Sequence, residues 1–91
     1  MKYAILQTTC YKKELKKALK RGHNINLIKA VVHKLASGEP LDAKHKDHSL
    51  SGSFAGFREC HITPDWLLVY LIENDIMTLT LTRTGTHSDL F

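Results

Sequence analysis

The sequence predicts one α+β domain spanning residues 1–91: an N-terminal strand, a two-helix hairpin and an antiparallel three-stranded meander. Two stretches in the first half repeat apolar residues at helical spacing. The second half contains strand-like segments separated by tight turns. With 43% hydrophobic and 24% charged residues, the composition is typical of a globular chain and excludes a wholly disordered one.

The first half predicts a short strand followed by two helices. Residues 3–7 (YAILQ) favour a strand, and Thr8 or Thr9 is a suitable N-cap for a helix that runs to Arg21 and stops at Gly22. The apolar positions of this helix are Tyr11, Leu15, Ala18 and Leu19. A second helix begins near Asn24 and ends at residues 37–40 (SGEP). Its apolar positions are Ile25, Ile28, Val31, Val32 and Leu35. The short link makes an antiparallel hairpin, whose apolar faces need a sheet to cover them.

The second half predicts three strands in sequence. Residues 41–53 are polar and predict an irregular loop that leads into a short edge. The expected strands are Phe57–Ile62, Trp66–Glu73 and Met77–Thr82, with turns at residues 63–65 and 74–75. The middle strand is almost entirely apolar, which indicates a central position with both faces buried. Residues 84–86 (TGT) are expected to break the last strand, leaving a short tail to Phe91.

Charge is distributed unevenly along the chain. Residues 1–46 contain eleven Lys or Arg against three acids, a net charge of +8, whereas residues 47–91 have a net charge of −4. Five lysines share the outer face of the first predicted helix: Lys12, Lys13, Lys16, Lys17 and Lys20. The strongly basic first half of the chain suggests a polyanionic partner or an acidic protein partner. The alternative is a solvated, lysine-rich face.

Cysteine content and hydropathy predict a cytoplasmic chain. Two cysteines, Cys10 and Cys60, are too few for a disulfide-rich scaffold or a zinc ribbon. The longest apolar run, residues 66–72, is far shorter than the ~20 residues of a membrane helix. The first residues lack the apolar segment of a signal peptide. We therefore expect reduced thiols and no membrane partner.

Polar residues of mechanistic type gather at one end of the predicted sheet. His61 closes one strand, and Asp65 opens the next after a tight turn. Because the last strand runs antiparallel to the central one, Arg83 and His87 return to the same rim. His48 lies in the loop before the meander.

Imidazoles near a guanidinium suit metal-free cleavage of an RNA phosphodiester. Histidine can deprotonate the 2′-hydroxyl or protonate the leaving 5′-oxygen near neutral pH, and arginine matches phosphate geometry. Trp66 or Phe91 could stack on an unpaired base. A three-His or two-His–carboxylate metal site is a second interpretation, although no HxxxH or HExxH spacing supports it. Ordinary surface histidines are the third.

Two segments give the sequence a family resemblance. Residues 46–66 (KDHSLSGSFAGFRECHITPDW) and 83–91 (RTGTHSDLF) resemble the YafQ branch of the RelE/ParE toxin superfamily in motif and spacing. The resemblance implies a microbial-ribonuclease-like sheet and a type II toxin that acts as an mRNA endoribonuclease on ribosome-bound messages. It also implies inhibition by a cognate antitoxin, contact with DNA only through that complex, and no cofactor or metal.

The resemblance also implies a set of site residues. The catalytic positions carried over are His48, His61, Asp65, His87 and Phe91, and the substrate contacts are Arg83, Trp66 and Lys46. Our hypothesis makes His87, on a mobile tail, the general acid and His61 or Asp65 the base. His48 and Arg83 then hold the phosphate, and Phe91 positions a base.

Other roles stay open at this stage. Glu59 shares strand parity with His61 and could join the site. Cys10 and Cys60 are interpreted as structural thiols, and the remaining three histidines as surface or helix residues. Two further functions compete with RNA cleavage: a non-catalytic toxin that inhibits another protein, and an RNA- or ribosome-binding inhibitor of the same fold.

Overall fold

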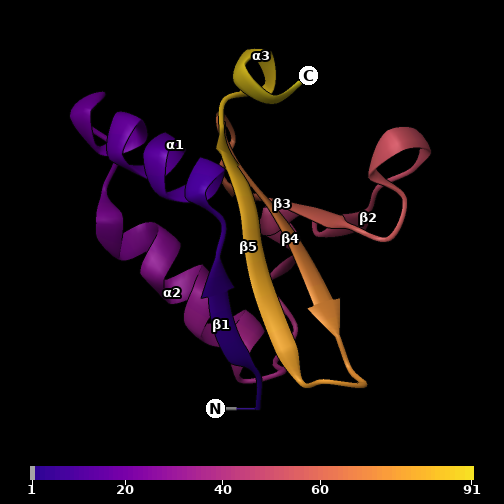
Figure 1. The fold of residues 1–91 in the computed structure, drawn as a ribbon. Coiled ribbons are helices and arrows are strands. Elements are labelled where there is room, and N and C mark those ends of the chain that lie inside the picture. The colour runs from indigo at the N-terminus through magenta and orange to yellow at the C-terminus, as the bar shows by residue number, and fades with distance from the viewer. Residues whose placement is uncertain (1) are drawn as a thin grey trace.

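The computed structural model describes residues 2–91 and contains a five-stranded sheet with helices on both faces (Figure 1). The elements in chain order are β1 (Ala4–Gln7), α1 (Thr9–Lys20), α2 (Ile25–Ala36), the 3-10 helix η1 (Ala43–His45), β2 (His48–Ser49), the 3-10 helix η2 (Gly52–Phe54), β3 (Arg58–Thr63), β4 (Trp66–Glu73), β5 (Thr78–Gly85) and α3 (His87–Leu90). The strand order is β1-β5-β4-β3-β2; β1 runs parallel to β5 and the other pairs are antiparallel. The predicted α+β class and meander are confirmed.

The helical hairpin forms where the sequence predicts it. The Thr8 side chain caps α1 by accepting from the Tyr11 N–H at 2.9 Å, and Asn24 caps α2 by accepting from the Asn26 N–H at 2.9 Å. Gly22 has a φ of +95°, a left-handed conformation that glycine adopts without strain, and it turns the chain between the helices. Leu19 differs from the prediction, because it is 36% exposed on α1 rather than packed in the core.

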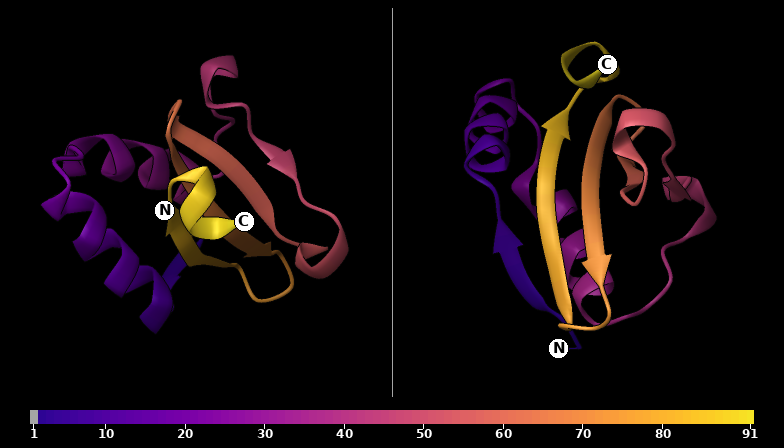
Figure 2. Two further views of the ribbon diagram at one scale, coloured as in Figure 1. Left: turned by 90° about the horizontal axis from the view of Figure 1, so that it is seen from above. Right: turned by 45° about the vertical axis from the view of Figure 1, so that its right-hand side comes forward.

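The two faces of the sheet have different environments. The helices α1 and α2 cover one face, and α3 follows the end of β5 (Figure 2) and packs its Leu90 against the other face. The helix-covered face of β4 contributes Trp66, Leu68 and Tyr70 to the main core. The opposite face contributes Leu67 and Val69 to a smaller cluster with Leu90 of α3. We call this second side of the sheet the open face. The expectation that β4 is central and buried is confirmed.

The last strand is longer than expected, because β5 runs to Gly85 instead of ending at Thr82. Gly85 pairs with Leu67, and the Thr84 hydroxyl donates to the Leu67 carbonyl at 2.7 Å. A register shift between Val69 and Tyr70 puts Arg83 opposite Val69, so Arg83 joins the open face. The expected break at residues 84–86 was wrong, because these hydrogen bonds continue the strand.

The tail after β5 is an anchored helix, which corrects the expectation of a mobile tail. Thr86 and Asp89 form a capping box at the start of α3, and Leu90 is 6% exposed against Leu67 and Val69. Among residues 2–91, none of the helices has the length and apolar character that a membrane crossing requires.

The burial of β4 predicts a large loss of stability for Leu68→Ala. Leu68 is 0% exposed in the core, and truncating a buried leucine costs roughly 2–5 kcal/mol, because a cavity remains. Leu6→Ala is the control, since Leu6 is 55% exposed and should change stability by about 0.5 kcal/mol or less. Urea unfolding followed by circular dichroism measures both, and equal midpoints for the two variants would contradict the core assignment.

Candidate active site

Register places His48, Glu59 and His61 on the open face together. His48 of β2 lies directly opposite Glu59 of β3, and cross-strand partners point to the same face of a sheet. His61 follows Glu59 by two residues and therefore shares that face. Glu59 is 3% exposed, and its Oε1 lies 4.0 Å from His61 Nε2. Glu59, left open by the sequence, thus sits between two of the predicted site histidines.

Backbone carbonyls orient both imidazoles. Nδ1 of His48 donates to the Lys46 carbonyl at 2.8 Å, and Nδ1 of His61 donates to the Pro64 carbonyl at 3.3 Å. In each ring this leaves Nε2 as the nitrogen directed away from the chain's own carbonyls. His45, which matches no motif, supports the same strand by donating from Nδ1 to the His61 carbonyl at 2.6 Å.

The helix α3 brings His87 and Phe91 to the open face. The His87 and Phe91 rings are 5.3 Å apart, and Phe91 meets Phe54 of η2 edge-on at 5.5 Å. Phe54 in turn contacts Phe57 at 6.4 Å. The three phenylalanine rings form an aromatic row that ends at Phe91, which is 53% exposed and lies next to the His87 imidazole.

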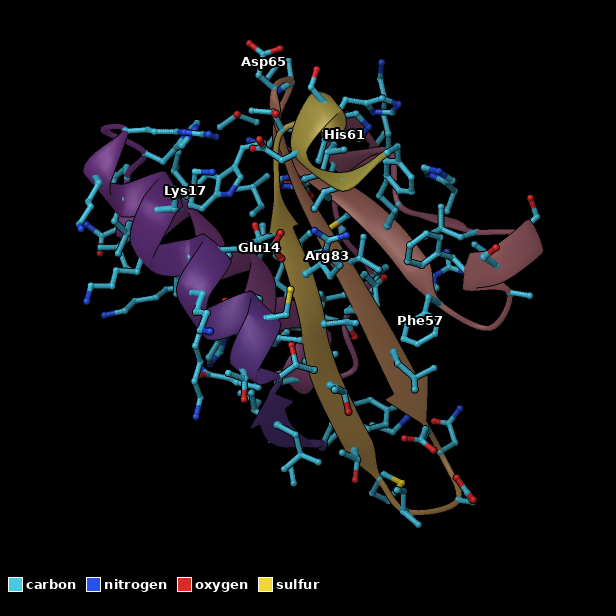
Figure 3. All side chains as sticks on the ribbon, turned by 45° about the horizontal axis from the view of Figure 1, so that its top comes forward. Glu14, Lys17, Phe57, His61, Asp65 and Arg83 are labelled. Carbon is cyan, nitrogen blue, oxygen red and sulfur yellow. The ribbon has the colours of Figure 1, made fainter. Side chains whose placement is uncertain are left out.

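The β3–β4 turn separates two of the predicted residues. Figure 3 shows Asp65 at the outer tip of the turn, where it is exposed, whereas His61 lies further down β3 and is partly buried. Lys46 is also exposed, in a left-handed conformation two residues before His48.

Trp66 does not lie with the other predicted site residues. Its indole is 0% exposed on the helix-covered face and is stacked by His23 with 4.7 Å between the ring centroids. The prediction that Trp66 contacts the substrate is corrected, because no surface of the ring is open to a base. Sequence parity could not reveal this, since β4 is apolar on both faces.

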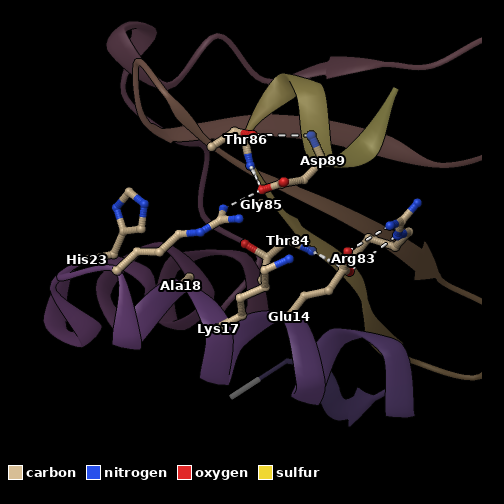
Figure 4. Close-up of a pocket in the computed structure, with 10 residues that line it drawn as sticks. Glu14, Lys17, Ala18, His23, Arg83, Thr84, Gly85, Thr86 and Asp89 are labelled. Carbon is tan, nitrogen blue, oxygen red and sulfur yellow. Dashed lines mark hydrogen bonds and ion pairs between the residues drawn. The ribbon is translucent and has the colours of Figure 1, made fainter.

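Arg83 faces the open side but is held by an ion pair. Its Nη2 lies 2.7 Å from Glu14 Oε2, and the Thr84 N–H donates to Glu14 Oε1 at 3.2 Å (Figure 4). This contact raises the pKa of Arg83 above its ordinary value. Glu14 was not predicted as a site residue, because only the packing of α1 on β5 brings it there.

A second ion pair fixes α3 from the side of α1. Arg21 Nη1 lies 2.7 Å from Asp89 Oδ2, which also accepts from the Thr86 N–H at 2.9 Å. Hydrogen bonds from Arg21 first, and then from Thr86, hold the pKa of Asp89 well below its usual range. Both ion pairs border a pocket of about 230 Å³ between α1, β5 and α3 (Figure 4).

The cysteines and the possible metal ligands of residues 2–91 form no further reactive or metal-binding site. Burial raises the pKa of Cys60 to about 12, so its thiol stays protonated in the core, and Cys10 is exposed. Across residues 2–91, no three His, Cys, Asp or Glu side chains are grouped so that they could hold a metal ion.

Solved structures define the class of protein: the fold is that of small bacterial toxins. A metal-bound toxin from Helicobacter pylori superposes with a TM-score of 0.92 and 45% identity, covering 98% of this chain and 99% of that chain. The toxin of the Escherichia coli DinJ-YafQ toxin-antitoxin complex superposes with a TM-score of 0.89 and 38% identity, covering 100% and 99%.

The particular family follows from the sequence comparisons. The family model for the bacterial toxin of type II toxin-antitoxin systems, YafQ, matches residues 3–91. The mRNA interferase toxin YafQ of Escherichia coli K12 is 42% identical over 82 residues, which are 89% of this chain and 87% of that protein. The chain therefore belongs to the YafQ toxin family, and the predicted resemblance is confirmed.

The low pKa of Asp89 predicts how α3 responds to acid. As the pH falls through the ordinary aspartate pKa of ~4, this carboxylate stays ionised, so its contribution to docking α3 is complete above that pH and is lost only in stronger acid. Asp89→Asn should loosen α3 at every pH above the wild-type acid transition and should abolish that transition. Leu90 methyl shifts in NMR spectra measure this.

Asp42→Asn is the control for that experiment, because Asp42 pairs at 3.5 Å with Lys34, a residue of the other helix of the hairpin. It should leave the Leu90 shifts unchanged. An acid transition that is identical in wild type and Asp89→Asn would contradict the role of the Arg21 pair.

Proposed function

We propose that this chain cleaves mRNA as the toxin of a type II toxin-antitoxin system. Membership of the YafQ family and the name of the Escherichia coli relative, an mRNA interferase toxin, support the activity. The observation that carries the proposal is that His48 and His61 share one face of the sheet, with both rings oriented by backbone carbonyls. The helix α3, which begins at His87, packs on the same face through Leu90.

The chemistry needs a base, an acid and a group that stabilises the phosphorane. The base removes the proton of the 2′-hydroxyl, whose oxygen then attacks phosphorus, while the acid protonates the leaving 5′-oxygen. His87 serves as the acid, from the start of α3. His61, through Nε2, or Asp65, at the turn tip, serves as the base. Cleavage leaves a 2′,3′-cyclic phosphate and a 5′-hydroxyl.

Substrate contacts come from the residues around these groups. His48 and Lys46 lie together before β3 and hold the phosphate, and Arg83 joins them by exchanging Glu14 for the RNA backbone. Phe91, half-exposed at the end of the aromatic row, stacks on a base.

The lysine face of α1 provides long-range attraction to RNA. Its five lysines are exposed, and none of the ion pairs found in residues 2–91 uses them. Ribosome-bound mRNA is the substrate that matches this lysine face, because the ribosomal RNA around the message adds further phosphates for the lysines to attract.

Substitution of His87 tests the cleavage proposal. His87→Ala should slow message cleavage by about 10²–10⁴-fold, the usual contribution of a general acid or base. Purified protein is added to a reconstituted translation system, and the 3′ ends of the fragments are mapped. Wild-type fragments should end in a 2′,3′-cyclic phosphate or 3′-phosphate.

The control for this substitution is His33→Ala, on the exposed surface of α2 and away from the open face. It should cleave at the wild-type rate. An intact message with translation still arrested by the wild type would instead make the protein a binding inhibitor.

We also propose that an acidic, amphipathic segment of a cognate antitoxin binds the helical hairpin. The Escherichia coli relative is seen in a complex with the antitoxin DinJ. On this chain α1 carries the exposed lysines and also contributes Leu15 to an apolar groove of about 280 Å³, which Ile28, Val32 and Lys29 of α2 line as well. A partner with acidic and apolar residues on one segment matches both features.

Salt and charge substitutions test the antitoxin proposal. Affinity for the cognate antitoxin, measured by calorimetry, should fall as salt rises, because exposed charges are screened beyond about a Debye length. Lys12→Gln combined with Lys16→Gln should weaken binding and flatten the salt dependence, whereas Lys44→Gln on η1 should not. An affinity independent of salt would rule out the electrostatic part of the proposal.

A further inference from the structure

The orientation of the His48 imidazole depends on more than the pairing of its strand. The strand β2 has only two residues, so its ladder contributes few hydrogen bonds. The ring nevertheless donates from Nδ1 to the Lys46 carbonyl at 2.8 Å, and Lys46 has left-handed backbone angles of φ 46° and ψ 45°. Something beyond the ladder must hold this turn in place.

The side chain of Asp47 ties the turn to two longer strands. Its carboxylate accepts a hydrogen bond from the Tyr70 hydroxyl of β4, and from Arg58 of β3 through Nε at 3.4 Å and Nη2 at 3.2 Å. Tyr70 is 1% exposed, so its hydroxyl is fixed within the core. One buried donor, the Tyr70 hydroxyl, and two donors of the partly exposed Arg58 side chain thus converge on one carboxylate.

The clamp and the imidazole occupy opposite faces. Arg58 and Tyr70 are cross-strand partners on the helix-covered face, whereas His48 pairs with Glu59 on the open face. Because neighbouring residues in extended chain point to opposite sides, fixing Asp47 on one side fixes the direction of His48 on the other. Lys46 is held at the same time, since its N–H donates to the Ala43 carbonyl at 3.1 Å.

The partners in this clamp keep their protonation states around neutral pH. Burial, followed by the contact with Asp47, raises the pKa of Tyr70 well above its ordinary value, so the hydroxyl stays a donor. The hydrogen bond to Asp47 raises the pKa of Arg58, which stays charged.

We infer that Asp47, clamped by Tyr70 and Arg58, is a positioning residue that fixes the tautomer and direction of the His48 imidazole. With Nδ1 bound to the Lys46 carbonyl, Nε2 is presented to the open face. The effect on cleavage rests on the proposed function of His48, whereas the effect on the ring itself does not.

Removal of one hydroxyl tests this inference. Tyr70→Phe keeps the ring that fills the core and deletes the bond to Asp47, and Asp47→Asn removes the charge with little change in volume. Both variants should shift the His48 ring nitrogens in ¹⁵N NMR spectra from a single tautomer toward a mixture. Message cleavage should slow by about 10-fold to 100-fold, because a misplaced His48 holds the phosphate out of line for attack.

Tyr3→Phe is the matched control. Tyr3 is another buried tyrosine of the same core, 7% exposed, and its hydroxyl donates to Asn74 Oδ1, in the turn after β4. Tyr3→Phe should lose a comparable amount of thermal stability and leave both the His48 spectrum and the cleavage rate unchanged. An equal change of the His48 spectrum in Tyr3→Phe and Tyr70→Phe would overturn the inference, since general loosening would then explain it.

A double variant separates this inference from the proposed function. In a His48→Ala background, Tyr70→Phe should cause no further loss of cleavage, because the clamp acts through His48. A full additional loss, or a His48 spectrum unchanged by both Tyr70→Phe and Asp47→Asn, would refute the positioning role. Wild-type cleavage by His48→Ala, with the spectrum still responding to Tyr70→Phe, would refute the proposed function of His48 and support the clamp.

Discussion

The unpaired edge of β5 is the constraint on which the rest of the structure depends. The strand β1 pairs with β5 only as far as Leu81, and α1 covers the remaining edge. Thr8 donates from its N–H to the Leu81 carbonyl and from its hydroxyl to the Thr82 carbonyl, and Glu14 accepts from the Thr84 N–H. Because buried backbone groups must be satisfied, α1 has to lie along this edge, and its position determines where Arg83 and α3 are held.

One face of the sheet carries the main hydrophobic core, and the other carries the candidate active site. The helix-covered face holds nearly all of the large buried side chains, so it can supply most of the hydrophobic stabilisation. The open face has only a small apolar cluster around Leu67, Val69 and Leu90, which leaves room for polar groups. Residues on the open face can therefore be substituted without loss of the main core, although the same strands carry both faces.

Local signals predicted the fold well, and long-range contacts account for what they missed. Caps and apolar periodicity sufficed for the hairpin, and the apolar run of β4 sufficed for the central strand. The parallel pairing of β1 could not be predicted, since its four residues are all exposed and show no alternation. Likewise Glu14, almost 70 residues before Arg83 in sequence, carries no local sign of its part in extending β5.

Strand parity accounts for the placement of only some of the predicted residues. Glu59 and His61 share a face because alternation within β3 requires it, whereas the sequence put His48 in a loop and only the pairing of β2 with β3 brings it to that face. The face of Trp66 cannot be deduced from an all-apolar strand. Orientation of the imidazoles lies beyond any pattern of residue types, because it depends on the carbonyls of Lys46 and Pro64. Backbone shape in two turns therefore sets the direction of both rings, and the residues that hold those turns are part of the site.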